Sequence, residues 1–396
     1  MGQQKLYFKK FYKNKGNWLP IIVFIVAILF VLIMNTRVSE DRDFTAMAQD
    51  EIKANKEILI LNEQTMKDSA KTEKDKADFE ASEKINKARV KEQEKMVDLY
   101  TDGKWAEAYR IKIHLLKESF GLYTGEMEAP AELKESIYRQ IAIYTKLEQL
   151  NIKSDQEDME TQGATFLYRT LANFVPVLFV IILCFTLNTI FTDRFRNNLD
   201  RDLLLPQKYT RATSERLLFG LLLSITFYVI SGVIAYLSAS LLSGAGSFSY
   251  PIAINIEPNI VTKPVGELLF QTMCLQVLTI VLVVLTLDLV SKLCKRVMPT
   301  LFISLLVLIS PVLAVGKIEP LNRWAHLLPG TYFNATSISD SYLSMLCDNG
   351  NINFENGILV LSIAILVLLL VNYVIDSRRG ISLTLNTNQN KSTVNY

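Results

Sequence analysis

Residues 16–36 read GNWLPIIVFIVAILFVLIMNT and contain no Lys, Arg, Asp or Glu. An α-helix rises ~1.5 Å per residue, so about 20 residues cross the ~30 Å hydrocarbon layer of a membrane. A charge at the centre of such a helix costs roughly 2.5–3.5 kcal/mol, and a long apolar run without charges therefore predicts a span. The chain has five further runs of this kind, at residues 170–192, 217–256, 268–287, 297–316 and 356–375. We predict an all-α integral membrane protein with six transmembrane helices.

The averages over the whole chain conceal this division. A net charge of +2 and 21% charged residues would be ordinary for a soluble enzyme. Because apolar spans and a highly charged segment are averaged together, the net charge indicates no partner. The four cysteines are far apart with no CxxC pair, and the chain has only two histidines. The sequence therefore predicts neither a disulfide framework nor a metal centre.

No sequence pattern in this chain carries identifiable chemistry. There is no GxxxxGK[ST] phosphate loop, no HExxH helix and no GxSxG in a strand–turn–helix setting. We expect no catalytic residue, no cofactor and no nucleic-acid partner for this chain, which is predicted not to be an enzyme by itself.

The positions of lysine and arginine predict the orientation, because short cytoplasmic loops carry an excess of both. The segments before the first span and after the second, fourth and sixth spans are basic. The alternate short loops hold little positive charge, and long segments translocate regardless of charge. We predict a multi-pass protein of the plasma membrane with both termini in the cytoplasm.

These observations set the expected boundaries. Spans are predicted at 17–36, 170–192, 217–243, 268–290, 298–316 and 356–375. The expected inner segments are an interfacial helix at 1–16, a loop at 193–216, a loop at 291–297 and a tail at 376–396. The expected outer segments are a helical domain at 37–169, a loop at 244–267 and an apolar segment at 317–355 that dips back into the membrane face.

The long outer segment, residues 37–169, is rich in Lys, Glu, Gln and Ala and predicts helices. Residues 41–99 favour a long solvated helix or a helical hairpin, and Asp102-Gly103 indicates a turn. An amphipathic helix follows from Trp105 and is expected to break at Gly121, Gly125 and Pro130. The resulting bundle is either a receptor surface or an insert that holds two spans together, and we favour the insert.

Two inner segments carry candidate functional residues. Before the first span, aromatic residues recur between lysines, which favours a helix in the headgroup zone over a merely basic tail; they are Tyr7, Phe8, Phe11 and Tyr12. After the second span, the loop combines charges with Leu203–Leu205 and Pro206. A simple connector would not need leucines facing the cytosol. We favour a short helix that docks onto a soluble partner over a self-packed turn.

Within the spans the polar residues are neutral. Four of them are candidates for lining a path through the membrane: Asn188, Gln271, Gln276 and Asn372. Asp288 lies at a span end, and we expect no buried charged relay of the kind an ion-coupled carrier needs. Pro176 and Pro311 are expected to kink their helices.

The arrangement of spans, the inner loop LLLPQKYTR (203–211), the outer SYPI (249–252) and LLPGTYF (327–333) resemble type-2 ABC (ATP-binding cassette) exporter permeases. The likeness is to Gram-positive exporters of peptides, bacteriocins or antibiotics. It implies that two six-span permeases, identical or paralogous, pair above two ATPase subunits that bind ATP and Mg. It also implies a coupling helix at 194–211, re-entrant outer helices at 317–338 and a surface helix at 5–15. The implied ATPase-coupling candidates are Arg194, Arg196, Asp200, Arg201, Leu203, Leu204, Lys208, Arg211 and Glu215.

The expected function is therefore that of a permease subunit. It would export a peptide or another amphipathic or hydrophobic substrate by coupling to ATP hydrolysis in a separate chain. The alternative is a non-transporting receptor or immunity protein that binds a peptide or toxin through its outer helical domain.

Overall fold

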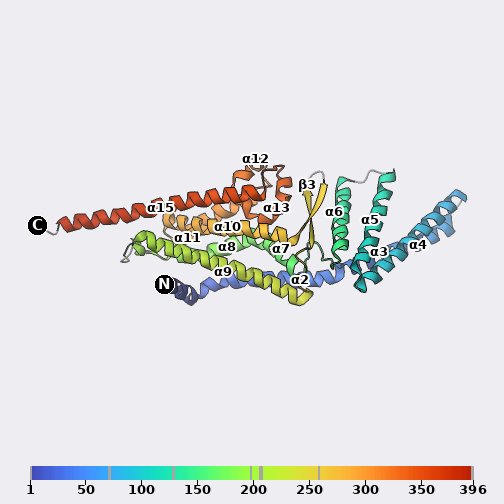
Figure 1. The fold of residues 1–396 in the computed structure, drawn as a ribbon, viewed down its shortest axis with the longest axis horizontal. Coiled ribbons are helices and arrows are strands. Elements are labelled where there is room, and N and C mark those ends of the chain that lie inside the picture. The colour runs from blue at the N-terminus through green and yellow to red at the C-terminus, as the bar shows by residue number, and fades with distance from the viewer. Residues whose placement is uncertain are drawn as a thin grey trace. The chain divides into compact units, whose positions relative to one another are not determined.

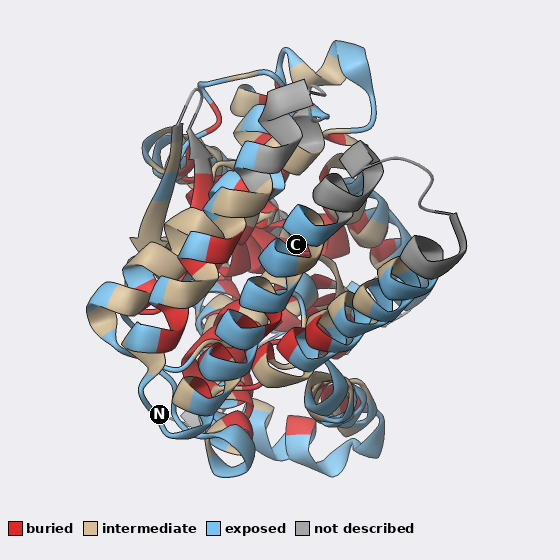
Figure 2. Ribbon diagram, turned by 90° about the vertical axis from the view of Figure 1, so that its right-hand side faces the viewer, coloured by how far each residue is buried: buried red, intermediate tan, exposed pale blue. Residues whose placement is uncertain are grey.

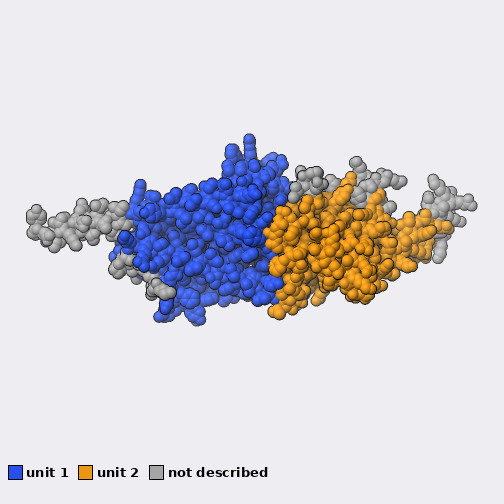
Figure 3. Space-filling view, viewed as in Figure 1, with its two compact units in different colours: residues 1–30, 167–238, 268–396 blue, residues 31–166, 239–267 orange. Residues whose placement is uncertain are grey.

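The computed structural model describes residues 2–69, 73–126, 130–196, 199–204, 208–256 and 259–393 of the 396-residue chain. The chain divides into two compact units (Figure 3). Unit 1 comprises Met1–Phe30, Leu167–Ser238 and Leu268–Tyr396, and unit 2 comprises Val31–Phe166 and Ala239–Glu267. Each unit is described by itself below.

Six helices are long and apolar enough to cross a membrane, as the charge-free runs predict. They are α2 (Trp18–Arg42), α7 (Gly163–Phe174) continued by α8 (Val180–Thr192), α9 (Tyr209–Ser243), α10 (Val265–Cys294), α11 (Val297–Ala314) and α15 (Phe354–Thr393). A π-helical turn, Val175–Phe179, joins α7 to α8 and contains Pro176. Pro311 lies inside α11.

Two of the six spans form the centre of unit 1. In the most apolar windows of α7–α8 and α10, 61% and 67% of the residues are buried, against 11–33% for the other four. Single helices carry buried residues on one face and exposed residues on the other (Figure 2). Phe24 of α2 packs against Phe179 and Phe227 with ring centroids 5.5 Å apart in both cases. The outer helices thus leave wide apolar surfaces free for lipid.

The N-terminal helix α1 (Gly2–Lys13) belongs to unit 1 and has both exposed and buried aromatic side chains. Phe8 and Tyr12 are exposed, as a helix in the headgroup zone requires. Phe11 is buried, and Tyr7 packs against Phe219 of α9 at a centroid distance of 5.7 Å. The expectation that all four aromatics face the headgroups is therefore wrong for these two, because they pack against protein.

Unit 2 contains four successive helices: α3 (Phe44–Ser69), α4 (Glu73–Thr101), α5 (Trp105–Glu126) and α6 (Ala131–Leu150). Each packs against the next, and α3 and α4 form the predicted hairpin (Figure 1). The turn before α5 uses Gly103 at φ +79°, a left-handed conformation that favours glycine. Helix α5 runs through Gly121 and Gly125, so the predicted break there is wrong. Two isolated glycines weaken a helix by only about 1 kcal/mol each.

An aromatic cluster closes the core of this helical set. The rings of Phe44 and Tyr100 stack at 4.4 Å, and Tyr109 packs against Tyr144 at 5.6 Å. The hydroxyl of the fully buried Tyr109 donates to the Ile152 carbonyl at 2.9 Å and accepts from the Ser154 amide at 2.7 Å. The cluster therefore fixes the segment after α6 to three helices.

The predicted outer loop at 244–267 contains an antiparallel β-hairpin. Strand β3 (Pro251–Ile256) pairs with β4 (Asn259–Pro264), with Pro251 opposite Pro264, and both strands pack on α6 (Figure 1). The expectation of a loop is wrong because the segment alternates β-branched residues on both sides of a Glu-Pro-Asn sequence, which favours strands around a turn. The other strands among the described residues are a short pair in the loop after α8.

Residues 317–355 of unit 1 form a compact series of short helices: α12 (Glu319–Asn322), 3-10 turns at Ala325–Leu327 and Pro329–Phe333, α13 (Ala335–Ser339) and α14 (Tyr342–Leu346). Thr331 donates to the Ala325 carbonyl at 2.6 Å, and Tyr332 donates to the His326 carbonyl at 2.8 Å. The second 3-10 turn packs against α11 and α15. Its entry into a membrane face stays a prediction.

Candidate functional site: a buried charge network

The inner loop after α8 is predicted to be a docking helix, but its described residues form no α-helix. Strands β1 (Phe195–Arg196) and β2 (Leu199–Asp200) pair, and a 3-10 turn follows at Arg201–Leu204. The segment is rich in Asp and Asn, whose side chains compete with helical hydrogen bonds and favour turns. The loop closes on itself, since the Arg201 amide donates to the Arg194 carbonyl at 2.9 Å.

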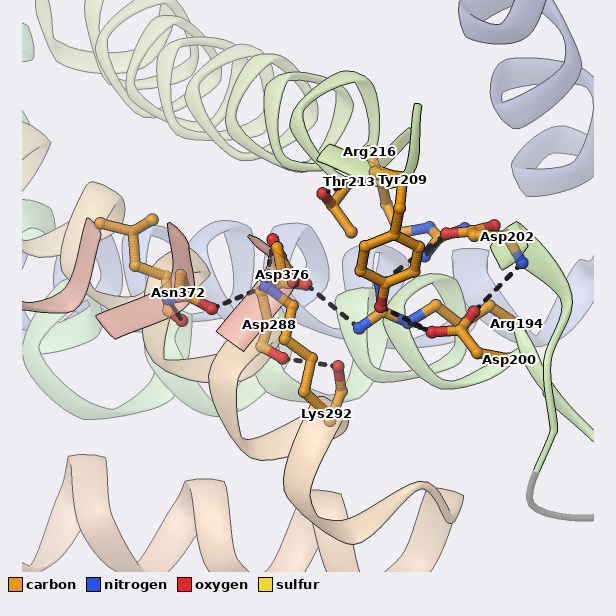
Figure 4. Close-up of polar contacts among 12 residues, drawn as sticks. Arg194, Asp200, Asp202, Tyr209, Thr213, Arg216, Asp288, Lys292, Asn372 and Asp376 are labelled. Atoms are coloured by element: carbon orange, nitrogen blue, oxygen red, sulfur yellow. Dashed lines mark hydrogen bonds and ion pairs between the residues drawn. The ribbon is translucent and has the colours of Figure 1, made fainter. Parts of the chain in front are cut away.

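Two aspartates of this loop point inward (Figure 4). Asp200 accepts a hydrogen bond from the Tyr209 hydroxyl at 2.7 Å. Asp202 meets the guanidinium of Arg216 through two contacts of 2.7 Å, Nη2 to Oδ1 and Nη1 to Oδ2. All three ionised side chains are buried. Such a two-pronged arginine–carboxylate pair fixes orientation as well as distance, so the loop is held firmly to α9.

Arg194 lies at the centre of the charged residues. Its side chain is 1% exposed, and its nitrogens are each 3.8 Å from a carboxylate oxygen of Asp200, Asp202 or Asp288. These distances exceed hydrogen-bond reach. Among the described residues none of the three guanidinium nitrogens has a hydrogen-bond partner. Its guanidinium also lies over the Phe195 ring at 4.6 Å.

Lys292 of α10 forms the second half of the network and is completely buried (Figure 4). Its Nζ lies 2.6 Å from Asp288 on the same helix and 2.9 Å from Asp376 on α15. It also donates to the Asn372 side-chain oxygen at 2.9 Å. A lysine ammonium has three N–H donors, and here three side-chain oxygens surround it.

We call these residues the charge network: Arg194, Asp200, Asp202, Arg216, Asp288, Lys292 and Asp376. Three cations face four carboxylates. Removing charges from water costs several kcal/mol per ion, which close partners must offset. The network connects the inner loop with α9, α10 and α15. Moving the loop without moving those helices would leave buried charges unpaired, so the loop and the helix ends are mechanically linked.

The structure separates the predicted coupling residues into two groups. Arg194 and Asp200 are buried in the charge network, whereas Arg201, Leu204, Lys208 and Arg211 are exposed. Leu203 and Glu215 are half-buried, and Glu215 pairs with Arg211 at 3.2 Å. The side chain of Arg196 and residues 205–207 lie outside the described part. The loop is thus both packed inward and exposed outward, which combines the two alternatives that its sequence leaves open.

The four neutral polar residues within the spans do not meet in one place. Asn188 donates to the Val297 carbonyl at 2.9 Å and links α8 to α11. Gln276 accepts from Tyr228 at 2.7 Å and donates to the Leu171 carbonyl at 2.9 Å. Asn372 belongs with Lys292, and Gln271 is half-buried. The hydrogen bonds of Asn188 and Gln276 join neighbouring helices and contribute to packing between spans.

The expectation of no buried charged relay is wrong. Asp288 and Lys292 are both fully buried within α10, and Asp376 joins them from α15. The signal was present in the sequence: Asp288 and Lys292 are four residues apart, as are Asn372 and Asp376, and each pair therefore lies on one helix face. From the sequence alone, Asp288 is expected at a span end and Asn372 within the sixth span, while Lys292 and Asp376 fall in the predicted loop and tail, so the two pairs are not connected.

No group of His, Cys, Asp or Glu side chains in the described ranges is arranged to hold a metal ion. Comparison with known proteins gives no relative: no family model, no curated protein and no solved structure matches this chain. A functional conclusion must rest on the charge network and the arrangement of the spans.

Proposed function

We propose that this chain is the membrane-spanning subunit of an ABC-type exporter, driven by ATP hydrolysis in a separate ATPase subunit. One observation carries the proposal: a loop with an exposed basic and apolar face is attached by buried ion pairs to α9 and α10, and α10 is in turn paired with α15. If a partner displaces the exposed side of this loop, the buried ion pairs transmit the displacement to the spanning helices.

The exposed face of the loop supplies the docking surface. Arg201, Lys208 and Arg211 are cationic, and Leu204 is 81% exposed. We take this leucine and the neighbouring cations as the contact surface for the partner. In the proposed complex the ATPase binds here, with complementary acidic and apolar residues.

The buried face transmits the movement. The Asp202–Arg216 pair carries a displacement of the loop to α9, and Arg194 joins the loop to Asp288 on α10. Lys292 then connects α10 to α15 through Asp376. Rigid-body movement of packed helices is an established way to convert a small shift at one site into a larger opening. The proposed cargo is a peptide or another amphipathic molecule, and a second six-span subunit forms the other half of the path.

Charge reversal on the exposed face tests the docking step. We expect Arg201→Glu with Arg211→Glu to abolish co-purification of the ATPase from native membranes. The control is Lys9→Glu with Lys13→Glu, which reverses two exposed charges on α1. A complex that survives the loop reversal with unaltered turnover would show that the wrong loop has been assigned.

Reconstitution tests the source of energy. In liposomes the chain alone is expected to give no uphill transport of peptide, and activity should need both the ATPase and ATP. Strong uphill transport by the isolated chain would exclude the proposal.

A second candidate is a receptor or immunity protein that binds its ligand through unit 2. It is favoured by a cavity of about 550 Å³ in that unit, lined by Glu51, Tyr100, Lys112, Tyr144 and Asp155 among others. Purified chain without any ATPase would then bind the peptide or toxin with unchanged affinity, and a bulky substitution in the cavity such as Ile143→Trp would abolish that binding.

A further inference from the structure

A separate cavity of about 480 Å³ lies within unit 1 beside the charge network. Its walls come from α1 and the turn that follows it, the end of α8, the described part of the next loop, α9 and the first residue of α11. We call it the basic cavity. It shares Arg201 with the docking surface and Arg194, Asp202 and Arg216 with the charge network, but the proposed function assigns it no ligand.

The walls of the basic cavity carry more positive than negative charges. Four cations contribute to the lining, namely Lys10, Arg194, Arg201 and Arg216, against the two carboxylates of Asp193 and Asp202. The lining therefore has a formal excess of two positive charges. Lys10 pairs with Asp193, and Arg216 pairs with Asp202. Arg194 lies 3.8 Å from carboxylates but makes no hydrogen bond to them, and Arg201 is the remaining cation.

Arg194 and Arg201 both have N–H donors that a ligand could use. Arg194 is buried, yet none of its guanidinium nitrogens has a hydrogen-bond partner among the described residues. Arg201 has no carboxylate partner in the described ranges. Buried polar groups in proteins are nearly always hydrogen-bonded, so the unsatisfied donors of Arg194 indicate an acceptor that completes them. Guanidinium groups match the oxygens of phosphate in a two-pronged geometry.

The electrostatic environment of Lys10 agrees with this. Partial burial lowers the pKa of the Lys10 ammonium, and the positive charges of Arg201 and Arg216 lower it further. An anion between these side chains would relieve the repulsion. Its affinity would therefore be coupled to the protonation of Lys10.

The remaining lining is mixed: Asn14, Asn17, Thr189 and Thr192 are polar, and four further residues are apolar or aromatic. Tyr7 and Phe11 of α1, Ile190 of α8 and Val297 of α11 face the same cavity. A ligand with a phosphate at one end and hydrocarbon at the other satisfies both kinds of wall. Exposed aromatics on α1, Phe8 and Tyr12, are suited to the membrane interface, where such molecules are abundant.

We propose that the basic cavity binds a phosphate-type oxyanion, presented either as the headgroup of an anionic phospholipid or as soluble phosphate. The phosphate oxygens accept from Arg194 and Arg201 and lie near the Lys10 ammonium. The experiments that test it need no ATPase, and the proposal holds for either of the functions considered above.

The lipid source is tested by native mass spectrometry of the full chain released from detergent with phosphatidylglycerol or phosphatidylcholine. The wild-type chain should retain phosphatidylglycerol in preference. Lys10→Gln with Arg201→Gln should lower that affinity about tenfold or more, since each basic residue contributes substantially to anionic-lipid binding. The matched control is Lys9→Gln with Lys13→Gln, which removes two exposed charges from α1 that do not line the cavity.

The soluble source is tested on protein purified with phosphatidylcholine alone. Inorganic phosphate should raise the melting temperature of the wild-type chain and of the control, and not that of the Lys10→Gln, Arg201→Gln variant. If the double variant does not fold, the single Arg201→Gln variant serves instead, because Arg201 is exposed and its loss breaks no described ion pair.

Selective loss of either phosphatidylglycerol or phosphate in the cavity variant supports the site and identifies its source. Two results would overturn it. One is a wild-type chain that prefers neither ligand. The other is an equal loss in the cavity and control variants, which would show a general effect of positive charge.

Discussion

Lys292 places its side-chain amine at a position where none of the side chain reaches the surface. A buried ammonium is tolerated only when close partners replace the lost water. Asp288, Asp376 and Asn372 supply them from two helices. The lysine therefore fixes the approach of α10 to α15 in a way that an apolar residue of similar size would not.

Replacement of Lys292 by methionine should be strongly destabilising. It keeps most of the volume and removes the charge, so Asp288 and Asp376 are left facing each other without compensation. Removing one partner of a buried ion pair costs about 3–5 kcal/mol. We expect a lower melting temperature in detergent by differential scanning fluorimetry.

Lys317 provides the matched control, because it is exposed and Lys317→Met should leave the melting temperature unchanged. Adding Asp288→Asn and Asp376→Asn to Lys292→Met should restore part of the loss. Equal melting temperatures for Lys292→Met and Lys317→Met would mean that Lys292 is not charged and paired as described.

Buried tyrosines make unit 2 sensitive to alkaline pH. Burial raises the pKa of Tyr109 well above its ordinary value near 10, because the phenolate would lose its water. The folded state therefore keeps the proton when the unfolded state has released it. Stability contributed in this way is complete below pH 10 and declines as the pH rises above 10, by about 1.4 kcal/mol per pH unit for each such tyrosine.

The Tyr109→Phe variant should show a shallower decline of stability between pH 10 and 11. Denaturant unfolding can be followed by Trp105 fluorescence in a chain where Trp18 and Trp324 are phenylalanine. Phenylalanine also loses two hydrogen bonds, so the slope with pH, not the absolute stability, is the measure. In the control Tyr138→Phe the substituted side chain is half exposed, and the slope should match that of the parent chain. Identical slopes in all three proteins would contradict the assignment.

Among the elements, the 3-10 turn at Pro329–Phe333 packs unusually tightly against α11. A Cβ on Gly330 would lie 2.5 Å from the Cβ of Pro311, and real Cβ atoms do not approach so closely. Gly330→Ala should therefore separate the turn from the helix. Overpacking of this kind costs about 1–3 kcal/mol, and a reduced melting temperature would reveal it.

Gly350→Ala is the appropriate comparison for this prediction, because nothing lies within 4 Å of the added carbon. It should melt at the wild-type temperature or slightly above. If Gly330→Ala has the same melting temperature as Gly350→Ala, the turn does not depend on close contact with α11.

The spanning helices could be predicted from sequence because each is decided by local composition. Any charge-free apolar run of 20 residues must span or be buried, whatever the rest of the chain does. The β3–β4 hairpin could not be predicted from the apolar run alone. Residues 244–256 continue the charge-free run that begins at residue 217, and the absence of charge does not distinguish a strand from a loop. The inner loop was assigned as a helix from its family likeness, against its own Asp and Asn content.

The charge network could be predicted only in part. Arg194 and Asp200 were selected as functional from the loop sequence, and the structure places both in the network. Lys292 and Asp376 were not connected, because they are 84 residues apart and one sequence contains no record of long-range pairing. Their spacing within each helix indicated a face, but not the identity of the facing helix.

For the whole molecule, the distribution of lysine and arginine predicts which side of the membrane α6 and the loop after α8 occupy. In a chain whose four cysteines are replaced by alanine, Lys146→Cys in α6 should react with a membrane-impermeant maleimide in intact cells. Lys208→Cys in the inner loop should react only after lysis. Both side chains are exposed, so access by the reagent is not limited by the fold. The reverse pattern would invert the orientation and place the basic cavity outside.

The pairing of Lys292 with Asp376 also has a consequence for biosynthesis. The chain is made from its N-terminus, and 84 residues separate the lysine from that aspartate. At 5–20 residues per second, roughly 4–17 s pass between the two at the ribosome. During this interval the ammonium has only Asp288 from its own helix. The insertion machinery must therefore hold the fourth span in a polar surrounding until the sixth arrives, and a nascent chain that stops before residue 376 should be recognised by quality control.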